Sequence, residues 1–350
     1  MQLIHDQLDP VFEIYTLLYL APQKEAYLKD IEHTWNELGV NGTEFIKDKN
    51  INAFCTYLDT FAEHMVTDAG VRYFEGPFDP LMIPMFSNFL PTIREIYQSE
   101  GEIDFSIYDQ AFVLEKLRSN ILEVSEIAVQ EDQPFDFDYF MECLFHTSLD
   151  CTTKWILLSI VRDPVLFFED TVQLIRRNEQ AYERAKDSVK KELIMYINDF
   201  TRWFEEKADE RFTHLLDLSS ATTKHIYPSF SKGASINSFL TAGLYYYGLI
   251  VDQLMNTENE LELKKTDLLM KTKALSDKSK IDILLTLRER PMFSLEISEK
   301  MSLSPSTTSH HMNMLVSSGL VQVIKQKGKV YYNINKDGFN SLKDVLTELF

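Results

Sequence analysis

The sequence has few cysteines and no long hydrophobic run, and both scarcities exclude classes of protein. Cys55, Cys143 and Cys151 are an odd, sparse set among 350 residues, which is typical of a reducing compartment and not of a disulfide framework. No uncharged apolar run approaches the roughly 18 residues of a membrane span. The first residues, MQLIHDQLDP, have neither a basic lead nor a cleavable apolar segment. We therefore expect a cytoplasmic protein with no membrane association.

Recognised catalytic and cofactor motifs are also absent. The sequence contains no glycine-rich phosphate loop of P-loop or Rossmann spacing and no G-x-S-x-G elbow. Cys143, His146 and Cys151 lie close together in the sequence, but their spacing matches no zinc pattern. We interpret them as buried thiols and a core or surface histidine. The sequence predicts no enzyme, no cofactor and no metal site.

Charge is unevenly distributed along the chain. The net charge is −19, yet residues 271–350 contain 12 Lys and Arg against 8 Asp and Glu, a net charge of +4. Residues 1–270 therefore carry −23. A polyanion would repel the chain as a whole but not its last 80 residues. The segregation predicts an acidic domain followed by a separate basic one, in a chain whose length and 45% hydrophobic content suit two or three domains.

Residues 1–220 predict an acidic, mainly helical domain. Apolar residues recur at helical spacing, with proline or glycine between the segments. Glu183 and Lys186 are one of several opposite-charge pairs at three- or four-residue spacing, which suit an exposed helix face. The predicted helices cover residues 8–20, 25–38, 45–70, 104–123 and 137–158, and a long charged pair covers 164–216.

An aromatic and methionine-rich stretch interrupts this domain where four prolines lie between residues 77 and 91. Two interpretations stay open, because Met and Phe can fill a core around irregular turns or line an adaptable apolar pocket. The second interpretation makes the domain a sensor of a small apolar ligand. Its candidate pocket residues are Phe78, Met82, Met85, Phe86 and Phe89.

Residues 221–256 change from helical periodicity to alternation. HIYPSF, ASINSF and LYYYGLIV predict three short strands, with Lys232-Gly233 as a turn between the first two. The tyrosines Tyr245 to Tyr247 suit core and edge packing better than ligand stacking. Residues 257–273 then predict a charged linking helix.

Residues 294–321 predict two short helices joined by a tight turn. Ser294 is a candidate N-cap of the first helix. The second helix begins at Ser304 and Pro305, and ends at Gly319. Thr308, Met312, Leu315 and Val316 share its inner face.

The opposite face of the second helix carries small donors and acceptors. No acidic residue occurs from Ser302 to Val323, so this helix could approach a phosphate backbone and present polar groups to base edges. Neighbours on a helix point about 100° apart, which assigns His310 to this face and His311 to the packing edge. The candidate contact residues are Ser306, Thr307, Ser309, His310 and Asn313.

A β-hairpin with a basic tip follows. Residues 320–334 alternate on either side of Lys327-Gly328, and Lys325, Lys327 and Lys329 cluster at the predicted turn. A short-residue helix beside such a hairpin is typical of a winged helix-turn-helix.

The residues of this region also resemble a known family. LSPSTTSHHMNMLVSSGLV at 303–321, preceded by Ala274-Leu275-Ser276-Asp277 and followed by GKVYYNIN, is similar to the DNA-binding domain of ArsR-type winged-helix regulators. The resemblance covers residues 261–350. Pro305, Thr308 and the stretch 278–280 depart from the usual pattern, but none of them threatens the fold.

The resemblance implies a homodimer whose first and last helices, residues 257–273 and 339–350, pack across the interface. Metal-sensing members carry a cysteine pair on the helix equivalent to 294–301, or Asp and His ligands on the last helix. Here the first lacks cysteine and the second lacks histidine, so arsenite or zinc sensing is not expected.

Together these patterns predict a mainly α chain: an acidic helical domain (1–220), a small β segment (221–256), a helical dimerisation linker (257–273) and a winged helix-turn-helix (274–350). The predicted function is a homodimeric transcription regulator, most simply a repressor, which binds double-stranded DNA at an inverted repeat. Two alternatives stay open. One is an interaction scaffold with an ancillary DNA-binding tail, and the other is an enzyme fused to a DNA-binding domain.

Overall fold

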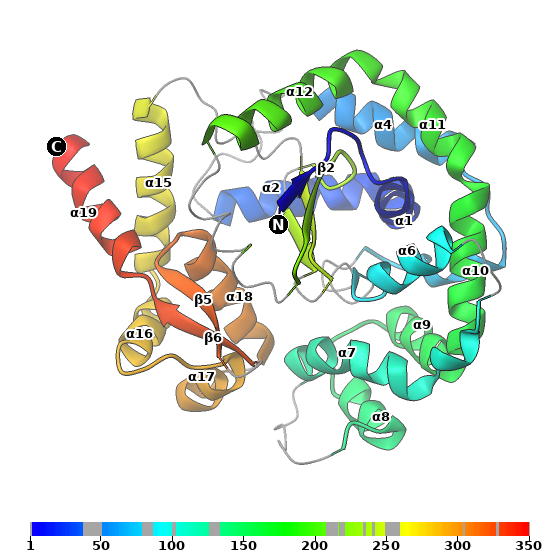
Figure 1. The fold of residues 1–350 in the computed structure, drawn as a ribbon. Helices are drawn as coiled ribbons and strands as arrows, with labels where there is room; N and C mark the ends of the chain where they lie inside the picture. The colour runs from blue at the N-terminus through cyan, green and yellow to red at the C-terminus, as the bar shows by residue number, and fades with distance from the viewer. Residues whose placement is uncertain are drawn as a thin grey trace. The chain divides into compact units, whose positions relative to one another are not determined.

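The chain is described by a computed structural model (Figure 1). The described residues are 2–37, 51–78, 87–99, 103–125, 134–207, 216, 221–233, 236–239, 242–248, 260–303, 305–326 and 329–349. They divide into two compact units. Unit 1 comprises residues 1–31, 46–117 and 149–256, and unit 2 comprises residues 32–45, 118–148 and 257–350. Within the described part of the chain, no helix is long and apolar enough to cross a membrane.

Helix α1 (Pro10–Leu20) is the centre of unit 1, because every residue from Val11 to Leu20 is buried. Asp9 caps the helix by accepting a hydrogen bond from the Val11 N–H at 3.0 Å. The same carboxylate pairs with Arg94 Nε at 2.7 Å and accepts a hydrogen bond from the Tyr246 hydroxyl. A helix that is apolar on all sides must be covered on all sides.

Most of the helices that follow α1, up to residue 207, begin with a side-chain cap or a proline. These helices are α2 (Lys24–Glu37), α4 (Ile51–His64), α6 (Leu90–Gln98), α7 (Gln110–Val124), α8 (Phe137–Phe145), α9 (Cys151–Arg162), α10 (Pro164–Arg177), α11 (Glu179–Ser188) and α12 (Lys190–Lys207), with short 3₁₀ turns at Ala21–Gln23, Ala69–Tyr73 and Phe105–Ile107. Helices α4, α6, α10 and α11 of unit 1 contact α1. Helices α2 and α7 begin in unit 1 and end in unit 2, and α8 belongs to unit 2.

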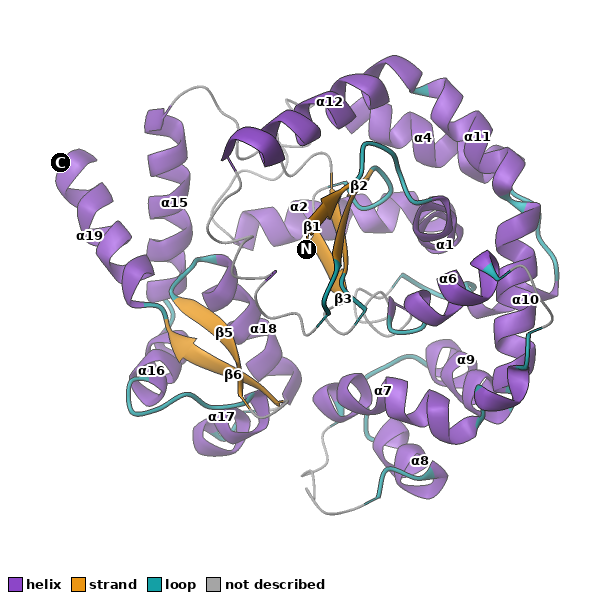
Figure 2. Cartoon of the chain, in the orientation of Figure 1, coloured by secondary structure: helices purple, strands orange, loops and turns teal. Residues whose placement is uncertain are grey.

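A four-stranded sheet lies in unit 1 (Figure 2), with strand order β1 (Gln2–Ile4), β2 (Lys224–Ser229), β4 (Leu244–Gly248) and β3 (Ile236–Phe239). Strand β2 is parallel to both β1 and β4, whereas β3 is antiparallel to β4. Every residue of β4 is buried, as expected of a strand covered on both faces. Tyr245 to Tyr247 therefore pack in the core, as predicted.

Three sequence predictions for residues 1–256 were wrong in detail. The range 137–158 is two helices, because Asp150 accepts hydrogen bonds from Thr152 N and Thr153 N and starts α9. The charged range 164–216 is three helices through residue 207, the first break lying at buried Asn178, whose amide pairs with the Val66 backbone.

The turn at Lys232-Gly233 does not make a hairpin. Strand β2 pairs with β4 instead of β3. Hydrogen bonds to helix α1 hold the residues that follow β2, so they do not turn back into a neighbouring strand. The N–H groups of Phe230 and Ser231 donate to the carboxylate of Glu13 on α1. Strand β1, which adds the sheet's fourth strand, has only three residues, too few for a periodic signal.

The C-terminal part of unit 2 is a helical domain with a two-stranded hairpin. Its elements are α15 (Glu260–Leu275), α16 (Lys278–Leu287), α17 (Ser294–Met301), α18 (Pro305–Ser317), β5 (Val321–Gln326), β6 (Lys329–Ile334) and α19 (Lys336–Leu349). Ala274, Ile283, Leu287, Met312 and Leu315 are among its core residues.

Helices α15 and α19 pack antiparallel, since Lys264 pairs with Glu348 whereas Lys271 donates to Ser341.

Candidate nucleic-acid interface

Helices α17 and α18 form the predicted helix-turn-helix, and both end in the same hydrogen-bond pattern. At the end of α17, Ser302 N–H donates to Glu299 O and Leu303 N–H to Ser298 O. At the end of α18, Gly319 N–H donates to Val316 O and Leu320 N–H to Leu315 O. These are Schellman motifs, which need a left-handed residue after the helix. Gly319 has φ +72° and Ser302 has φ +54°.

Helix α18 has the two faces that its sequence predicts. Thr308, Met312 and Leu315 are buried against the domain core. Thr307, Asn313 and Ser317 are exposed. Met314 is also buried, and its position was not anticipated. The helix therefore presents small polar side chains outward from a rigid hydrophobic support.

The other predicted contact residues of α18 are placed by their backbone alone. Ser306, Ser309 and His310 lie within the helix, and their side chains lie outside the described part of the structure. His311, predicted at the packing edge, is half-buried. Burial opposes ionisation of the nearby Asp277, but the Lys280 backbone N–H and the Lys280 ammonium lower the pKa of that carboxyl, and His311 adds a smaller contribution in the same direction.

The predicted hairpin is present, with β5 and β6 in register from Val321↔Ile334 to Gln326↔Lys329. Lys325 and Lys329 lie in the two strands at the end of the ladder, whereas Lys327 lies outside the described residues. Met292 forms an antiparallel bridge with β6, because its N–H and C=O both hydrogen-bond to the backbone of Tyr332. The wing is thus fixed to the segment that precedes α17.

One capping prediction for this domain was wrong. Ser294 is the first residue of α17, not its N-cap, which is Phe293. Glu296 does the capping, since its carboxylate accepts the Phe293 N–H at 3.2 Å and pairs with Arg290 at 2.6 Å. A helix start depends on which nearby carboxylate reaches the backbone, which short-range composition leaves undecided.

A close approach that no sequence pattern predicted joins α19 to the end of α18. A Cβ on Gly338 would collide with the carbonyl oxygen of Gly319. The same carbonyl accepts a hydrogen bond from Asn335 Nδ2 at 2.9 Å. Gly338 and Asn335 therefore set where the last helix begins relative to α18.

Two of the five candidate apolar-pocket residues, Phe78 and Phe89, are described by the structure, and they pack against different residues. Phe78 packs near Tyr19 and Tyr27. Phe89 is fully buried against Phe167 and Phe168. Met82, Met85 and Phe86 lie outside the described residues.

The sequence analysis predicted no metal site at Cys143, His146 and Cys151. Cys143 is buried and Cys151 exposed, and burial raises the pKa of the Cys143 thiol. His146 is exposed and its Nδ1 lies 2.9 Å from Glu142 O. Across the residues described here, no three His, Cys, Asp or Glu side chains are grouped as a metal site would require.

Comparison with known proteins identifies the C-terminal domain. Residues 277–323 match the family model described as "Bacterial regulatory protein, arsR family". These residues form an arsR-family helix-turn-helix domain. No curated protein and no solved structure gave a significant match to the chain.

The arsR-family match covers α16, α17, α18 and the first part of β5. It includes the helix whose outward face is polar and free of acidic residues. A domain of this family indicates DNA binding in transcription regulation. The rest of the chain lies outside the matched residues.

Proposed function

We propose that this chain is a homodimeric transcription regulator, acting as a repressor, that reads an inverted-repeat operator with helix α18. The observation that carries the proposal is the outward face of α18 within the arsR-family domain. Thr307, Asn313 and Ser317 are exposed there, and no acidic side chain occurs between Ser302 and Val323. Small donors and acceptors on such a helix suit hydrogen bonds to base edges in a major groove.

The lysines of the β5–β6 hairpin support a second role, phosphate contact beside the bases that α18 would read. Lys325 and Lys329 lie at the end of the β5–β6 ladder where the chain turns from one strand to the next, and Lys327 falls between them in the sequence. Lysines on a wing add phosphate contacts, which orient the recognition helix without reading sequence.

Dimerisation through α15 and α19 is supported by exposed apolar side chains on this antiparallel pair. Leu269 on α15 is 51% exposed and Leu346 on α19 is 41% exposed. A second copy of the pair would cover both leucines. Two-fold symmetry would then place two α18 helices about one helical turn of DNA apart.

Unit 1, which contains most of the acidic N-terminal region, is proposed to sense a ligand or partner. Residues 1–270 carry a net charge of −23, which would lower affinity for random DNA and leave recognition to the basic domain. The chain would work in the cytoplasm, where bacterial DNA lies.

The test is fluorescence anisotropy of the full chain with its own upstream DNA and with a scrambled duplex, across salt concentrations. We expect tight binding to the upstream duplex only, with affinity falling as salt rises. Equal affinity for the two duplexes at every salt concentration would contradict the proposal.

A further inference from the structure

Strand β1 is the shortest strand of the sheet in unit 1 and lies at its edge. It pairs with β2 over three positions, from Gln2↔Lys224 to Ile4↔Ile226. One residue further on, the His5 N–H donates to the Ile226 carbonyl oxygen at 2.9 Å. Ile4 is 40% exposed, so apolar burial contributes little to this pairing. A strand this short needs side-chain contacts to hold it on the sheet.

Two histidines join the end of β1 to β2. The Nε2 atom of His5 lies 3.1 Å from the Nδ1 atom of His225, at hydrogen-bond distance. Both rings are half-buried, so protons from solvent can reach them. A hydrogen bond between two imidazoles needs one nitrogen with a proton and one without. The bond therefore survives the first proton that the pair takes up. It is lost with the second, when both rings carry only donors and a positive charge.

The His5 ring also begins a column of stacked rings. It lies face to face with the Tyr227 ring of β2, with ring centres 3.8 Å apart. Tyr227 stacks on Tyr246 of β4, and Tyr246 stacks on Phe12 of α1. The Arg94 guanidinium donates to the Tyr227 hydroxyl at 2.9 Å, and burial raises the pKa of that hydroxyl. The column therefore runs from the edge strand to the central helix of unit 1.

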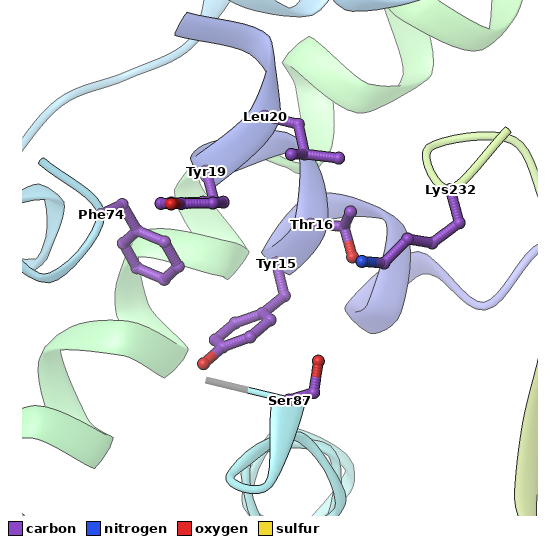
Figure 3. A pocket seen from close by; sticks show the side chains of 7 residues that line it. All are labelled: Tyr15, Thr16, Tyr19, Leu20, Phe74, Ser87 and Lys232. Atoms are coloured by element: carbon purple, nitrogen blue, oxygen red, sulfur yellow. The ribbon is translucent and has the colours of Figure 1, made fainter. Parts of the chain in front are cut away.

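Helix α1 receives this column at its first turn. Further along the same helix, Tyr15, Tyr19 and Leu20 line a small pocket of unit 1 (Figure 3). Residues 6–8 alone separate His5 from Asp9, the N-cap of α1. A change in the position of β1 would therefore reach α1 both along the chain and through the ring column.

Charged groups around the two histidines act in both directions. Burial lowers the pKa of His5 from its ordinary 6.5, and the nearby His225 and Arg94 lower it further. Asp9 and Asp6 oppose this effect. Burial and Arg94 also lower the pKa of His225. Both rings are therefore neutral at neutral pH, where their hydrogen bond can form.

Acid acts against the closed arrangement of the pair. Below pH 6.5 the histidines of a released strand would bind protons more readily than those of the closed pair. The closed state therefore loses stability as pH falls. Lys224, the neighbouring cation on β2, does not face the pair, because successive side chains of a strand point to opposite faces of the sheet.

We propose that His5 and His225 are an acid-sensitive latch, which holds β1 on the sheet while at least one imidazole is neutral and releases it when both are protonated. Release would leave the edge of β2 open and would remove His5 from the ring column that ends on α1. The latch goes beyond the proposed DNA binding, because its signal is the proton and all its residues lie in unit 1.

Hydrogen exchange of the full chain, without DNA and with EDTA present, tests the latch. Protection of backbone amides is measured at pH 7.5 and pH 5 and is corrected for the intrinsic effect of pH on exchange. We expect the protection of residues 2–5 and 224–226 to fall at least about tenfold at pH 5, while helices α4 and α10 keep theirs.

A double variant assigns the effect to the histidines. Glutamine places an amide group where imidazole has Nε2, asparagine places one where imidazole has Nδ1, and neither titrates. In His5→Gln, His225→Asn the protection of β1 should change less than about twofold between the two pH values. His64→Gln is the matched control, because His64 is an exposed histidine of α4 in the same unit. It should behave as wild type.

NMR of wild-type protein with carbon-13-labelled histidine gives a second readout that does not depend on the double variant. The single variants assign the His5 and His225 signals. We expect these two rings to titrate in two coupled steps below pH 6.5, because the second proton must break the shared hydrogen bond.

Several outcomes would overturn the latch. They are unchanged protection of β1 in wild type at pH 5, equal losses in wild type and the double variant, and independent titration of the two rings at pH 6.5 or above. A loss at pH 5 that α4 and α10 share would show global acid unfolding and would also overturn it. DNA takes no part in these measurements, so failure of operator binding is seen separately.

Discussion

Lys232 shows how strongly the chemistry of a lysine depends on where its amine lies. Burial lowers its pKa from the ordinary 10.5 to about 7. Below about pH 7 the amine is protonated in both the folded and the unfolded chain. Between about pH 7 and pH 10.5 the unfolded chain binds more protons, so this group makes the folded state more stable as pH rises.

Replacing Lys232 should remove that pH dependence. We expect wild-type protein to gain on the order of 1–3 kcal/mol of unfolding free energy relative to Lys232→Met between pH 7 and pH 10. Urea unfolding followed by tryptophan fluorescence at several pH values measures the difference. The control is Lys191→Met, which removes an exposed lysine on α12 and should follow wild type. Parallel pH profiles for wild type and Lys232→Met would contradict the prediction.

Asn313 is the exposed α18 residue best suited to read a base, because its amide can donate and accept together. We expect Asn313→Ala to lose about 1–3 kcal/mol on the operator and little on random DNA, which relaxes specificity. Lys327→Ala is the contrasting variant. It should weaken binding to all sequences and lower the salt slope by about 1.

Anisotropy titrations of both variants against operator and scrambled duplexes measure these effects. The assignment of roles fails if the two variants lose equal affinity on both duplexes.

At the scale of elements, α17 and α18 end in the same motif with different residues at the left-handed position. Serine adopts this conformation at a cost that glycine avoids. Ser302 and Gly319 therefore offer reciprocal substitutions at equivalent positions. A Cβ on Gly319 would meet nothing within 4 Å, so its substitution tests conformation without a clash.

We expect Ser302→Gly to stabilise the helix-turn-helix by about 0.5–1 kcal/mol and Gly319→Ala to destabilise it by about 1 kcal/mol. Amide hydrogen exchange in α17 and α18 of the full chain reports the local free energy. Faster exchange in Ser302→Gly, or unchanged exchange in Gly319→Ala, would show that the left-handed residue does not limit stability here.

At the scale of the whole molecule, the proposed assembly depends on the exposed side chains of α15 and α19. We expect the double variant Leu269→Glu, Leu346→Glu to be monomeric in light scattering, because buried unpaired carboxylates oppose association. Its operator affinity should fall at least about tenfold, since two half-sites would no longer be bound together.

The matched control is Leu285→Glu, because Leu285 is 53% exposed on α16, outside the α15–α19 pair. It should remain dimeric. A dimeric double variant, or a control that also dissociates, would remove α15 and α19 from the interface.

The sequence by itself determined the arsR-family domain, because its signals are local. Helical spacing assigned Thr308, Met312 and Leu315 to the core, Gly319 marked the end of α18, and alternation around Lys327 predicted the wing. Most helices of the N-terminal region were found in the same way. Their breaks were not, since Asp150 and Asn178 act through specific backbone contacts.

Only the tertiary structure decided the sheet pairing and the burial of Lys232. Glu13 and Ser231 are 218 residues apart in the chain, so no periodicity connects them. Alternation predicts a strand but not its neighbour, and the Glu13 carboxylate diverted the turn after β2 from the expected hairpin. Composition likewise cannot tell a solvated lysine from a buried one. Burial, which only the packed chain creates, lowers the pKa of Lys232.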